Sequence, residues 1–427
     1  MSDPSPDVAK ADILVAGAGA AGLSAAIALS MSGFSVLCAG PTDTNVNGRT
    51  VALFEGSLRF FRSLGLWRHL YPQAGPIEKI RMIDATGSAL PIPPVEFSAR
   101  EIGLEIFGAN IENNLLVAKL SEIAETIPDL TRHDGFLTDI IAEADTQHAV
   151  LDNGTSVETK LIVAADGRKS LARSKARIAA RSWTYPQIAL TLLLAHAKPH
   201  QAISTEFHTR SGPCTLVPLP ASKNDPHRSS LVWLMSKAEA ERRQQLDDKA
   251  LADEIERQVH GVLGPMRLDS PRGFFPMAGM RVSRLVGHRT ALVGEAAHEF
   301  PPLAAQGLNL SLRDTAMLVD CLENARAAGR DIGTAQSLAA YQTSRHADVS
   351  LRTNAVDVLN RSLLSDFLPV DLIRGAGLLA FNLIGPFRRA IMREGVLPHD
   401  HLPRLMRPLS VQRVRTGEAF NTSGHNK

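Results

Sequence analysis

The feature that most constrains the fold is a glycine-rich turn close to the N-terminus. It carries the glycines of a G-x-G-x-x-G pattern, with two alanines before the last: Gly17, Gly19, Ala20, Ala21 and Gly22. An apolar strand is predicted over 13–15, and apolar residues recur at helical spacing after the turn. Glycines let the backbone approach a pyrophosphate closely, and the following helix directs its free N–H groups and positive dipole end at that charge. The segment predicts a dinucleotide site, with an ordinary strand-turn-helix connection as the alternative.

Length and composition exclude several other classes of protein. The chain has 427 residues, 44% of them hydrophobic, so it can bury a large core in roughly two or three domains. Its net charge of +2 offers no basic track for nucleic acid, which is not expected as a partner. The three cysteines, Cys38, Cys214 and Cys321, lie far apart and predict neither a disulfide framework nor a metal site.

No targeting or membrane-spanning segment is expected. Residues 1–10 lack the apolar region of a signal peptide. Asp371 and Arg374 interrupt the longest apolar stretch before it reaches the roughly 18 residues that a spanning helix needs. Together with the cysteine content, this favours the reducing environment of the cytoplasm.

Two further apolar segments end in small-residue turns. The strand predicted over 160–165 leads into Asp166 and Gly167, for which a plain Asp-Gly turn is the alternative. The strand predicted over 290–294 leads into a segment rich in Gly, Ala, Pro and His, which ends at a helix expected over 310–324. Because the carboxyl ends of parallel strands meet at one edge of a sheet, these turns are expected to face a common ligand.

The segment 33–38 predicts the second parallel strand. Such a strand usually ends near an acid that holds a ribose hydroxyl, but that position is occupied by Gly40 or the alanine before it. The loop that follows delivers Arg49 to the start of a helical pattern over 51–67. Arg49 could clamp a phosphate or contact a flavin, although most loop arginines are solvated.

A second layer is predicted downstream. Apolar or alternating stretches indicate an antiparallel sheet that forms a substrate module, at 80–83, 188–194, 203–208 and 231–234. The charged segment 237–259 predicts a surface helix that crosses this module.

Taken together, the chain resembles the single-component FAD-dependent aromatic hydroxylases, and most closely their ubiquinone-biosynthesis branch. Five ordered motifs carry the resemblance: Gly17 to Gly22; Gly48-Arg49-Thr-Val-Ala-Leu with Ser57 and Leu64-Gly-Leu-Trp67; Glu112-Asn113-Asn-Leu-Leu116; Ala165-Asp166-Gly167 with Ser170 and Arg173; and Gly294 to Asp314. The resemblance implies an α/β fold with a Rossmann-like FAD-binding domain, a β-sheet substrate domain of the p-hydroxybenzoate hydroxylase kind and a helical C-terminal region. We assign 1–75, 100–180 and 275–330 to the first, 76–99 and 181–274 to the second, and 331–427 to the third.

The resemblance also implies a function. The protein would be an FAD-dependent monooxygenase that hydroxylates an aromatic ring, most closely a polyprenylphenol of ubiquinone biosynthesis, through a flavin C4a-hydroperoxide and with NAD(P)H as reductant. Two alternatives stay open. One is a non-catalytic flavin-fold protein that binds a lipid or quinone or supports a biosynthetic assembly, and the other is a flavin reductase acting on an isoprenoid.

By the same resemblance, the cofactor-binding residues are Gly17, Gly19, Ala20, Ala21, Gly22, Arg49, Asn113, Asp166, Gly167, Glu295, Pro302, Ala305, Gly307, Leu308 and Asn309. Pro302 and Arg49 would lie closest to the reacting part of the flavin. Glu295 stands where Asp or Asn is usual. Ala305 replaces a usual glycine, so its Cβ would disfavour a positive φ. No general base can be selected among Tyr71, His208 and His298.

The expected partners are a lipophilic phenol and O2, with a homo-oligomer or a biosynthetic complex as further possibilities. An amphipathic tract near the C-terminus bears on this, with apolar residues at 363–384 followed by Arg388, Arg389, Arg393, Arg404 and Arg407. Helices that pack onto the catalytic domains are one interpretation. Peripheral contact with the inner face of the membrane is the other, since a polyprenylated phenol resides in the bilayer.

Overall fold

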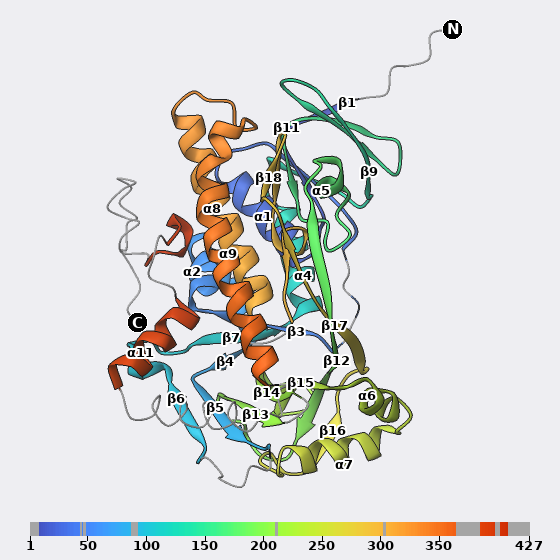
Figure 1. Ribbon diagram of the computed structural model, residues 1–427, viewed down its shortest axis with the longest axis vertical. Helices are drawn as coiled ribbons and strands as arrows, with labels where there is room; N and C mark the ends of the chain where they lie inside the picture. Colours follow the sequence, from blue (N-terminus) through green and yellow to red (C-terminus); the bar gives the residue numbers. More distant parts are fainter. Residues whose placement is uncertain are drawn as a thin grey trace, which may run out of the picture.

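The structure is a computed structural model of the 427-residue chain. It describes residues 8–42, 45, 48–86, 93–209, 212–301, 305–363, 385–397 and 402–408, with side chains left out at 350–363, 385–387 and 391. Two sheets and a bundle of long helices form its layers (Figure 1).

The first sheet is largely parallel and has the strand order β18-β19-β11-β1-β2-β8; β10 also pairs with β11, and β9 pairs with β10. Its strands are β1 (Val8–Ala16), β2 (Val36–Ala39), β8 (Leu130–His133), β9 (Leu137–Ala142), β10 (Gln147–Leu151), β11 (Ser156–Ala164), β18 (Val286–Gly287) and β19 (Thr290–Leu292). The neighbours β19, β11, β1, β2 and β8 are parallel throughout. This order confirms the strands predicted before each of the three small-residue turns.

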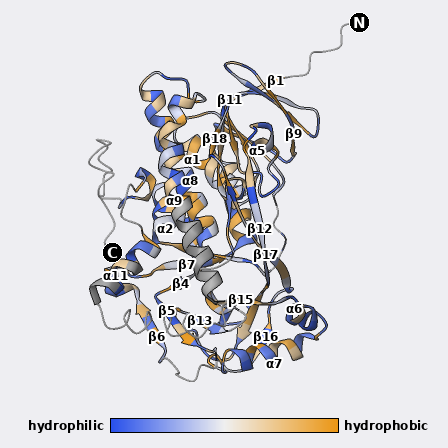
Figure 2. Ribbon diagram, viewed as in Figure 1, coloured by the Kyte–Doolittle hydropathy of each residue, from blue (hydrophilic) through white to orange (hydrophobic). Residues whose placement is uncertain are grey.

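Hydrophobic burial holds this sheet between helices. Residues 13–16 of β1 and 161–164 of β11 are fully buried, as expected for parallel strands covered on both faces. The covering helices include α1 (Ala20–Met31), α4 (Asn113–Ala124) and α8 (Gln306–Ala327). Figure 2 shows the hydrophobic character of these central strands and of α1. α1 begins at Ala20 as predicted.

The second sheet has nine strands and forms the predicted second layer. They are β5 (Lys79–Asp84), β6 (Val95–Ser98), β12 (Ala180–His196), β13 (Ile203–Thr209), β14 (Gly212–Leu219), β15 (Arg228–Ser236), β16 (Met266–Leu268), β17 (Gly273–Val282) and β20 (His298–Glu299). The predicted antiparallel pairing holds except between β5 and β13, which are parallel. One face of the sheet buries Phe207, Leu216 and Trp233 under two helices.

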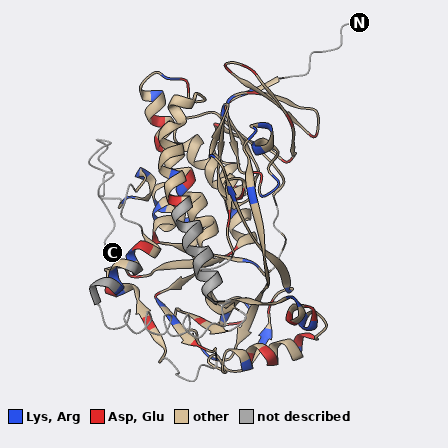
Figure 3. Cartoon of the chain, in the orientation of Figure 1, with Lys and Arg blue, Asp and Glu red and all other residues tan. Residues whose placement is uncertain are grey.

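Those two helices correct one expectation. The charged segment 237–259 forms α6 (Lys237–Gln244) and α7 (Asp248–Gln258) instead of one helix. Asp247 separates them because its side chain accepts a hydrogen bond from the Ala250 N–H and caps α7. Both helices carry charges of both signs (Figure 3), and the Arg242–Glu254 ion pair joins them.

A small sheet of order β3-β7-β4 joins the two large ones, from β3 (Thr50–Phe54), β4 (Ala74–Ile77) and β7 (Gly108–Glu112). The helical pattern expected over 51–67 is therefore wrong in its first part. Residues 50–54 pair with β7, so tertiary pairing overrides the local pattern, and helices follow only as α2 (Glu55–Ser63) and α3 (Trp67–Leu70).

The remaining elements are short or C-terminal. They are α5 (Leu171–Lys175), α9 (Ala335–Leu363), α11 (Gly385–Val396) and the short 3-10 turns η1 (Tyr71–Gln73), η2 (Ala99–Ile102), η3 (Gly294–Ala296) and η4 (Arg404–Met406). α8, which begins earlier than the predicted Leu310, packs along α9. Within the described ranges, no helix combines the length and the apolar character needed to span a membrane.

The amphipathic C-terminal tract lies mostly outside the described residues. This applies to the side chains of Leu363, Leu364, Phe367, Leu372, Leu378, Leu379, Phe381, Leu383 and Ile384. Two of the arginines that follow are engaged within the fold, Arg388 with Glu101 and Arg404 with Glu323. The division into domains stays a prediction. The long strands β12 and β17 begin at Ala180 and Gly273, close to the predicted domain boundaries after residues 180 and 274.

Gly22 is expected to be essential for the packing of α1. A Cβ at Gly22 would lie 1.9 Å from the Gly17 carbonyl oxygen, which is backbone and cannot rotate away. Gly22→Ala should therefore lower the free energy of unfolding by about 1–3 kcal/mol, measured by urea denaturation. Gly56→Ala is the matched control, since a Cβ there meets nothing closer than 3.7 Å. Equal stability of the two variants would contradict the prediction.

Candidate functional site

The ends of β1, β11 and β19 lie side by side. Ala16 is in register with Ala164, and Ala164 with Leu292. Their continuations stay bonded, because the Ala165 N–H donates to the Ala16 oxygen at 2.8 Å and the Val293 N–H to the Ala164 oxygen at 2.9 Å. The structure thus brings the three predicted turns together at one sheet edge.

The glycines of the first turn differ in what surrounds them. Gly17 has φ +109°, and a Cβ there would meet the Ala165 carbonyl oxygen at 2.2 Å. A Cβ on Gly19 would meet nothing within 4 Å. Gly19 is the N-cap of α1, which has no side-chain cap and no acidic residue in its first turn. The helix therefore presents free N–H groups of Ala20 and Ala21 to an open space, a geometry that suits an anion.

Packing explains why no acidic residue stands at the end of β2 to hold a ribose hydroxyl. Gly40 follows β2 with φ +150°, and a Cβ there would lie 2.7 Å from the Ala18 backbone nitrogen. No acidic side chain fits at this position. A nearby polar group is Arg132 at the end of β8, whose guanidinium donates to Thr42 Oγ1 at 2.7 Å.

The second turn is tied to the third. Asp166 accepts a hydrogen bond from the Ala172 N–H through Oδ2, while Oδ1 is buried without a partner among the described residues. Gly167 has φ +78° and open space at its Cβ position. Arg173, in α5, donates to the carbonyl oxygen of Ala296 at 2.9 Å and so links the two turns.

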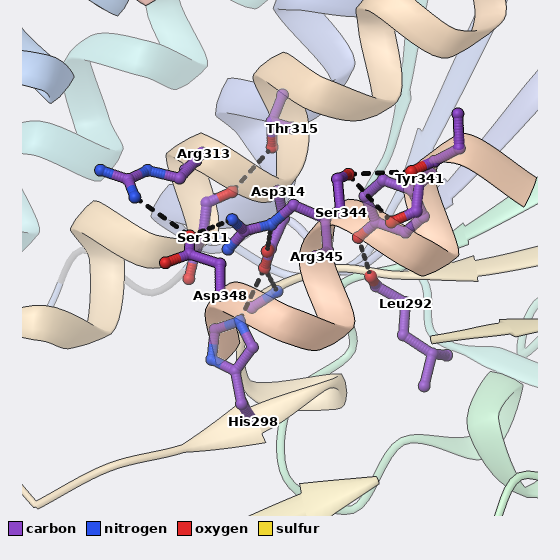
Figure 4. Close-up of polar contacts among 12 residues, drawn as sticks. Leu292, His298, Ser311, Arg313, Asp314, Thr315, Tyr341, Ser344, Arg345 and Asp348 are labelled. Carbon is purple, nitrogen blue, oxygen red and sulfur yellow. Dashed lines mark hydrogen bonds and ion pairs between the residues drawn. The ribbon is translucent and has the colours of Figure 1, made fainter. Parts of the chain in front are cut away.

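A buried ionic network supports the third turn (Figure 4). Asp314, on α8, accepts hydrogen bonds from the Gly294 N–H at 3.2 Å, from His298 Nε2 at 2.7 Å and from Arg345 Nε at 2.7 Å. Burial alone would raise the pKa of Asp314, but His298 and Arg345 outweigh it and lower that pKa. Arg345 and Asp348 both lie on α9, and Asp348 also accepts a hydrogen bond from Arg313 of α8, so α9 is fixed to the same cluster.

The start of α8 is strained and firmly held. Ala305 is its N-cap and has φ +50°. This left-handed conformation is unfavourable for alanine, as expected at a position where glycine is usual. Asn309 fixes this end, because Oδ1 accepts from the Phe54 N–H and Nδ2 donates to the Ala52 and Ala305 carbonyl oxygens. Gly307 has open space at its Cβ position, whereas Leu308 is half-buried against the core.

The structure places the other predicted site residues as follows. Arg49 is exposed, with its guanidinium 5.5 Å from the Phe275 ring, and its carbonyl oxygen accepts from the Asn113 N–H at 3.0 Å. Glu295 is exposed in η3, at the same edge. Pro302 lies outside the described residues.

A cavity of about 460 Å³ lies beside the start of α8. Ala305 and Gln306 form part of its wall, together with residues of the small sheet, the second sheet and α11. Most lining side chains are apolar, including Met82, Phe97 and Leu234. Such an apolar hollow with few polar groups is typical of a small-molecule site.

Two polar side chains of this wall were missed by the sequence analysis. Asn110 is 1% exposed; Nδ2 donates to the Pro218 oxygen and Ser230 Oγ, and Oδ1 has no partner in the part of the chain that the structure describes. Among the described residues that line the cavity, Glu206 is the one with an ionisable side chain. A signal existed, since Ser204, Glu206 and His208 alternate with Phe207 and place a polar face on a predicted strand.

The three candidate bases are separated by the structure. Tyr71 is 62% exposed and packs on Trp67. His298 is buried in the Asp314 network and is not part of the cavity wall. His208 lies next to that wall, with Nε2 2.9 Å from Glu206 Oε1.

Comparison with known proteins agrees with this geometry. Residues 10–354 match the family model described as FAD binding domain. The chain belongs to this family. It is 33% identical over 407 residues to ubiquinone hydroxylase UbiL of Rhodospirillum rubrum, covering 93% of this chain and 92% of that protein. It is 28% identical to the 3-demethoxyubiquinol 3-hydroxylase of Escherichia coli, covering 90% of this chain and 97% of that protein.

The fold also matches a solved structure. p-Nitrophenol 4-monooxygenase PnpA of Pseudomonas putida superposes with a TM-score of 0.74 at 16% identity, covering 91% of this chain and 98% of that one. The predicted fold class and the resemblance to the FAD-dependent hydroxylases are confirmed.

Removing Arg345 should destabilise the fold strongly. Arg345→Met leaves the buried carboxylate of Asp314 without one of its two counter-charges, which should cost about 3–5 kcal/mol in urea denaturation. Because the pKa of Asp314 is lowered in the folded state, the difference from wild type should narrow as the pH falls below about 4. Arg242→Met, which breaks exposed ion pairs, should change stability little. Similar losses in both variants would refute this role of the network.

Ala305 should be stabilised by glycine. Ala305→Gly relieves the left-handed strain, so the free energy of unfolding should rise by about 0.5–1 kcal/mol after the entropy cost of glycine. Ala316→Gly, in the buried interior of the same helix, is the control and should lower stability. A loss of stability in the Ala305 variant would show that the strain is not relieved.

Proposed function

We propose that the protein is an FAD-dependent monooxygenase that hydroxylates a polyprenylphenol of ubiquinone biosynthesis, with NAD(P)H as reductant. The observation that carries this proposal is the apolar cavity beside the start of α8, at the helix end that family resemblance assigns to the flavin ring. The 33% identity to a protein named ubiquinone hydroxylase supports the same assignment.

The residues present at the sheet edge fit FAD. Space is open at the Cβ positions of Gly19, Gly167 and Gly307, where a cofactor could approach the backbone. The N–H groups at the start of α1 would bind the pyrophosphate. Asp166 Oδ1, buried without a partner among the described residues, would accept a hydrogen bond from a cofactor group.

The further cofactor contacts are proposed by resemblance. Arg49 and Asn113 lie together at the junction of β3 and α4, and Glu295 is exposed beside the first turn. The backbone from Ala305 through Leu308 to Asn309 would line the flavin ring. When bound, FAD supplies the redox chemistry by accepting a hydride and activating O2 for transfer of one oxygen atom to the substrate.

The chain itself contributes binding, orientation and exclusion of water. Phe97, Met82 and Leu234 give the cavity an apolar lining that would hold a lipophilic ring and keep water from the reacting atoms. Asn309 fixes the start of α8, and the Asp314 network fixes the third turn, so both sides of the flavin position are rigid.

The proposal includes a place in the cell. A polyprenylated phenol resides in the bilayer, so a cytoplasmic enzyme would meet its substrate at the inner face of the membrane. Peripheral contact there, a homo-oligomer and a biosynthetic complex all belong to this proposal.

The purified full chain tests the enzyme assignment. It should be yellow, its flavin absorbance should bleach when NAD(P)H is added without oxygen, and oxygen uptake should accompany a hydroxylated product. A colourless protein that does not bind FAD would favour a non-catalytic lipid or quinone carrier. Reduction of an isoprenoid double bond without oxygen uptake would favour the reductase.

The genetic test addresses the substrate. Deletion of the gene in its host should lead to a quinone precursor that lacks one hydroxyl group, detected by mass spectrometry. An unchanged quinone pool would refute the ubiquinone assignment and leave the flavoprotein assignment in place.

Gly19 gives a residue-level test of the cofactor site. Gly19→Ala adds a methyl group that meets no protein atom, so the unfolding transition should change little. The same methyl group would intrude on the pyrophosphate, so FAD affinity should fall at least about tenfold, measured by fluorescence titration. Gly154→Ala is a control with equally open space away from this edge; its φ of +84° makes alanine strained there and should lower stability, but FAD affinity should be unchanged. Unaltered affinity in the Gly19 variant would refute the proposed role of the turn.

A further inference from the structure

Glu206 is the ionisable side chain on the described cavity wall, and no step of the proposed chemistry uses it. It lies on β13, opposite Thr215 of β14 and Met82 of β5. These neighbours are neutral or apolar. The Glu206 side chain is 29% exposed, so its carboxylate is accessible from the cavity and is the charged group that a ligand would meet on the described wall.

His208 lies beside this carboxylate. The two residues are two positions apart on one strand, so their side chains project from the same face. Nε2 of His208 lies 2.9 Å from Glu206 Oε1. The histidine side chain is 11% exposed and the glutamate 29%, which leaves the carboxylate as the more accessible member of the pair.

The carboxylate retains capacity to accept hydrogen bonds. An ionised carboxylate has about four acceptor positions, and the contact with His208 at 2.9 Å lacks the geometry of a hydrogen bond, so none of these positions is filled by His208. A ligand hydroxyl that enters the cavity could therefore donate to Glu206. A hydrogen bond to an ionised acceptor is roughly twice as strong as a neutral one.

We propose that Glu206 accepts a hydrogen bond from the phenolic hydroxyl of the substrate and so selects rings with a free hydroxyl over their methyl ethers. This inference rests on the proposed function, since it deepens the recognition of a phenol in the same cavity. An acceptor at the hydroxyl also increases the electron density of the ring, as transfer of oxygen to an aromatic carbon requires. A methyl ether cannot donate and would leave the carboxylate facing an apolar group.

The test compares binding of 4-hexylphenol and 4-hexylanisole, its methyl ether, to the FAD-loaded full chain by isothermal titration calorimetry. Both probes are neutral at pH 7; the ether lacks the donor hydrogen of the phenol and carries a methyl group in its place, so the Glu206 variants report the part of the preference that is due to the hydrogen bond. Wild type should bind the phenol at least tenfold more tightly than the ether. Glu206→Leu should abolish this preference, whereas Glu206→Gln, which keeps an acceptor oxygen without the charge, should retain part of it.

Two controls secure the result. Glu122→Gln removes a carboxylate from the exposed side of α4 and should leave the preference unchanged. FAD content of each variant reports whether it folds, and Glu206→Gln keeps the test decisive if Glu206→Leu does not fold. An undiminished preference in both Glu206 variants would overturn the inference, as would equal binding of the two probes by wild type.

The outcome is distinguishable from failure of the proposed function. Binding is measured without turnover, and hydroxylated 4-hexylphenol is sought separately by mass spectrometry after addition of NAD(P)H and oxygen. Hydroxylation together with an undiminished preference in the variants would refute the Glu206 assignment alone. A preference that depends on Glu206, without FAD-dependent hydroxylation of this probe or of a polyprenylphenol, would refute the proposed function and support the phenol site.

Discussion

The buried carboxylate of Asp314 is the interaction on which the candidate site depends. Its oxygens bind a backbone N–H of the third turn, a histidine that follows this turn and an arginine of α9. These groups come from separate parts of the chain, so their convergence fixes the turn against both long helices. Removal of any one donor would leave a charge in a place where water cannot compensate for it.

The same rigidity sets the shape of the cavity. Asn309, in the first turn of α8, bonds to β3 and so fixes the start of the helix. β3 belongs to the small sheet that joins the two larger sheets. The apolar wall and the sheet edge with its open glycines are therefore held in one frame. An oxygen-transfer enzyme needs this arrangement, because the ring of the substrate and the cofactor must meet in a space that excludes water.

The sequence predicted those features that depend on local chemistry. Glycines 17–22 and the apolar runs before each turn identified the parallel sheet edge, and Ala305 identified a strained backbone. Residues 51–54 were mistaken for helix because their pairing with β7 is a tertiary interaction. The sequence shows that Gly40 stands where an acidic residue is usual. The reason, the close approach of the Ala18 backbone to Gly40, can be seen only in the structure. Glu206 was missed because its importance lies in the cavity around it.

The strand order of the parallel sheet has a consequence for synthesis on the ribosome. β11 lies between β1, which is made first, and β19, which emerges more than a hundred residues later. β10 already pairs with residues 156–159 of β11, but the N–H and carbonyl groups along 162–164 stay unpaired during that interval and can pair with another chain. The nascent protein is therefore most exposed to aggregation while the intervening second sheet is being translated, and chaperones would be of greatest value at that stage.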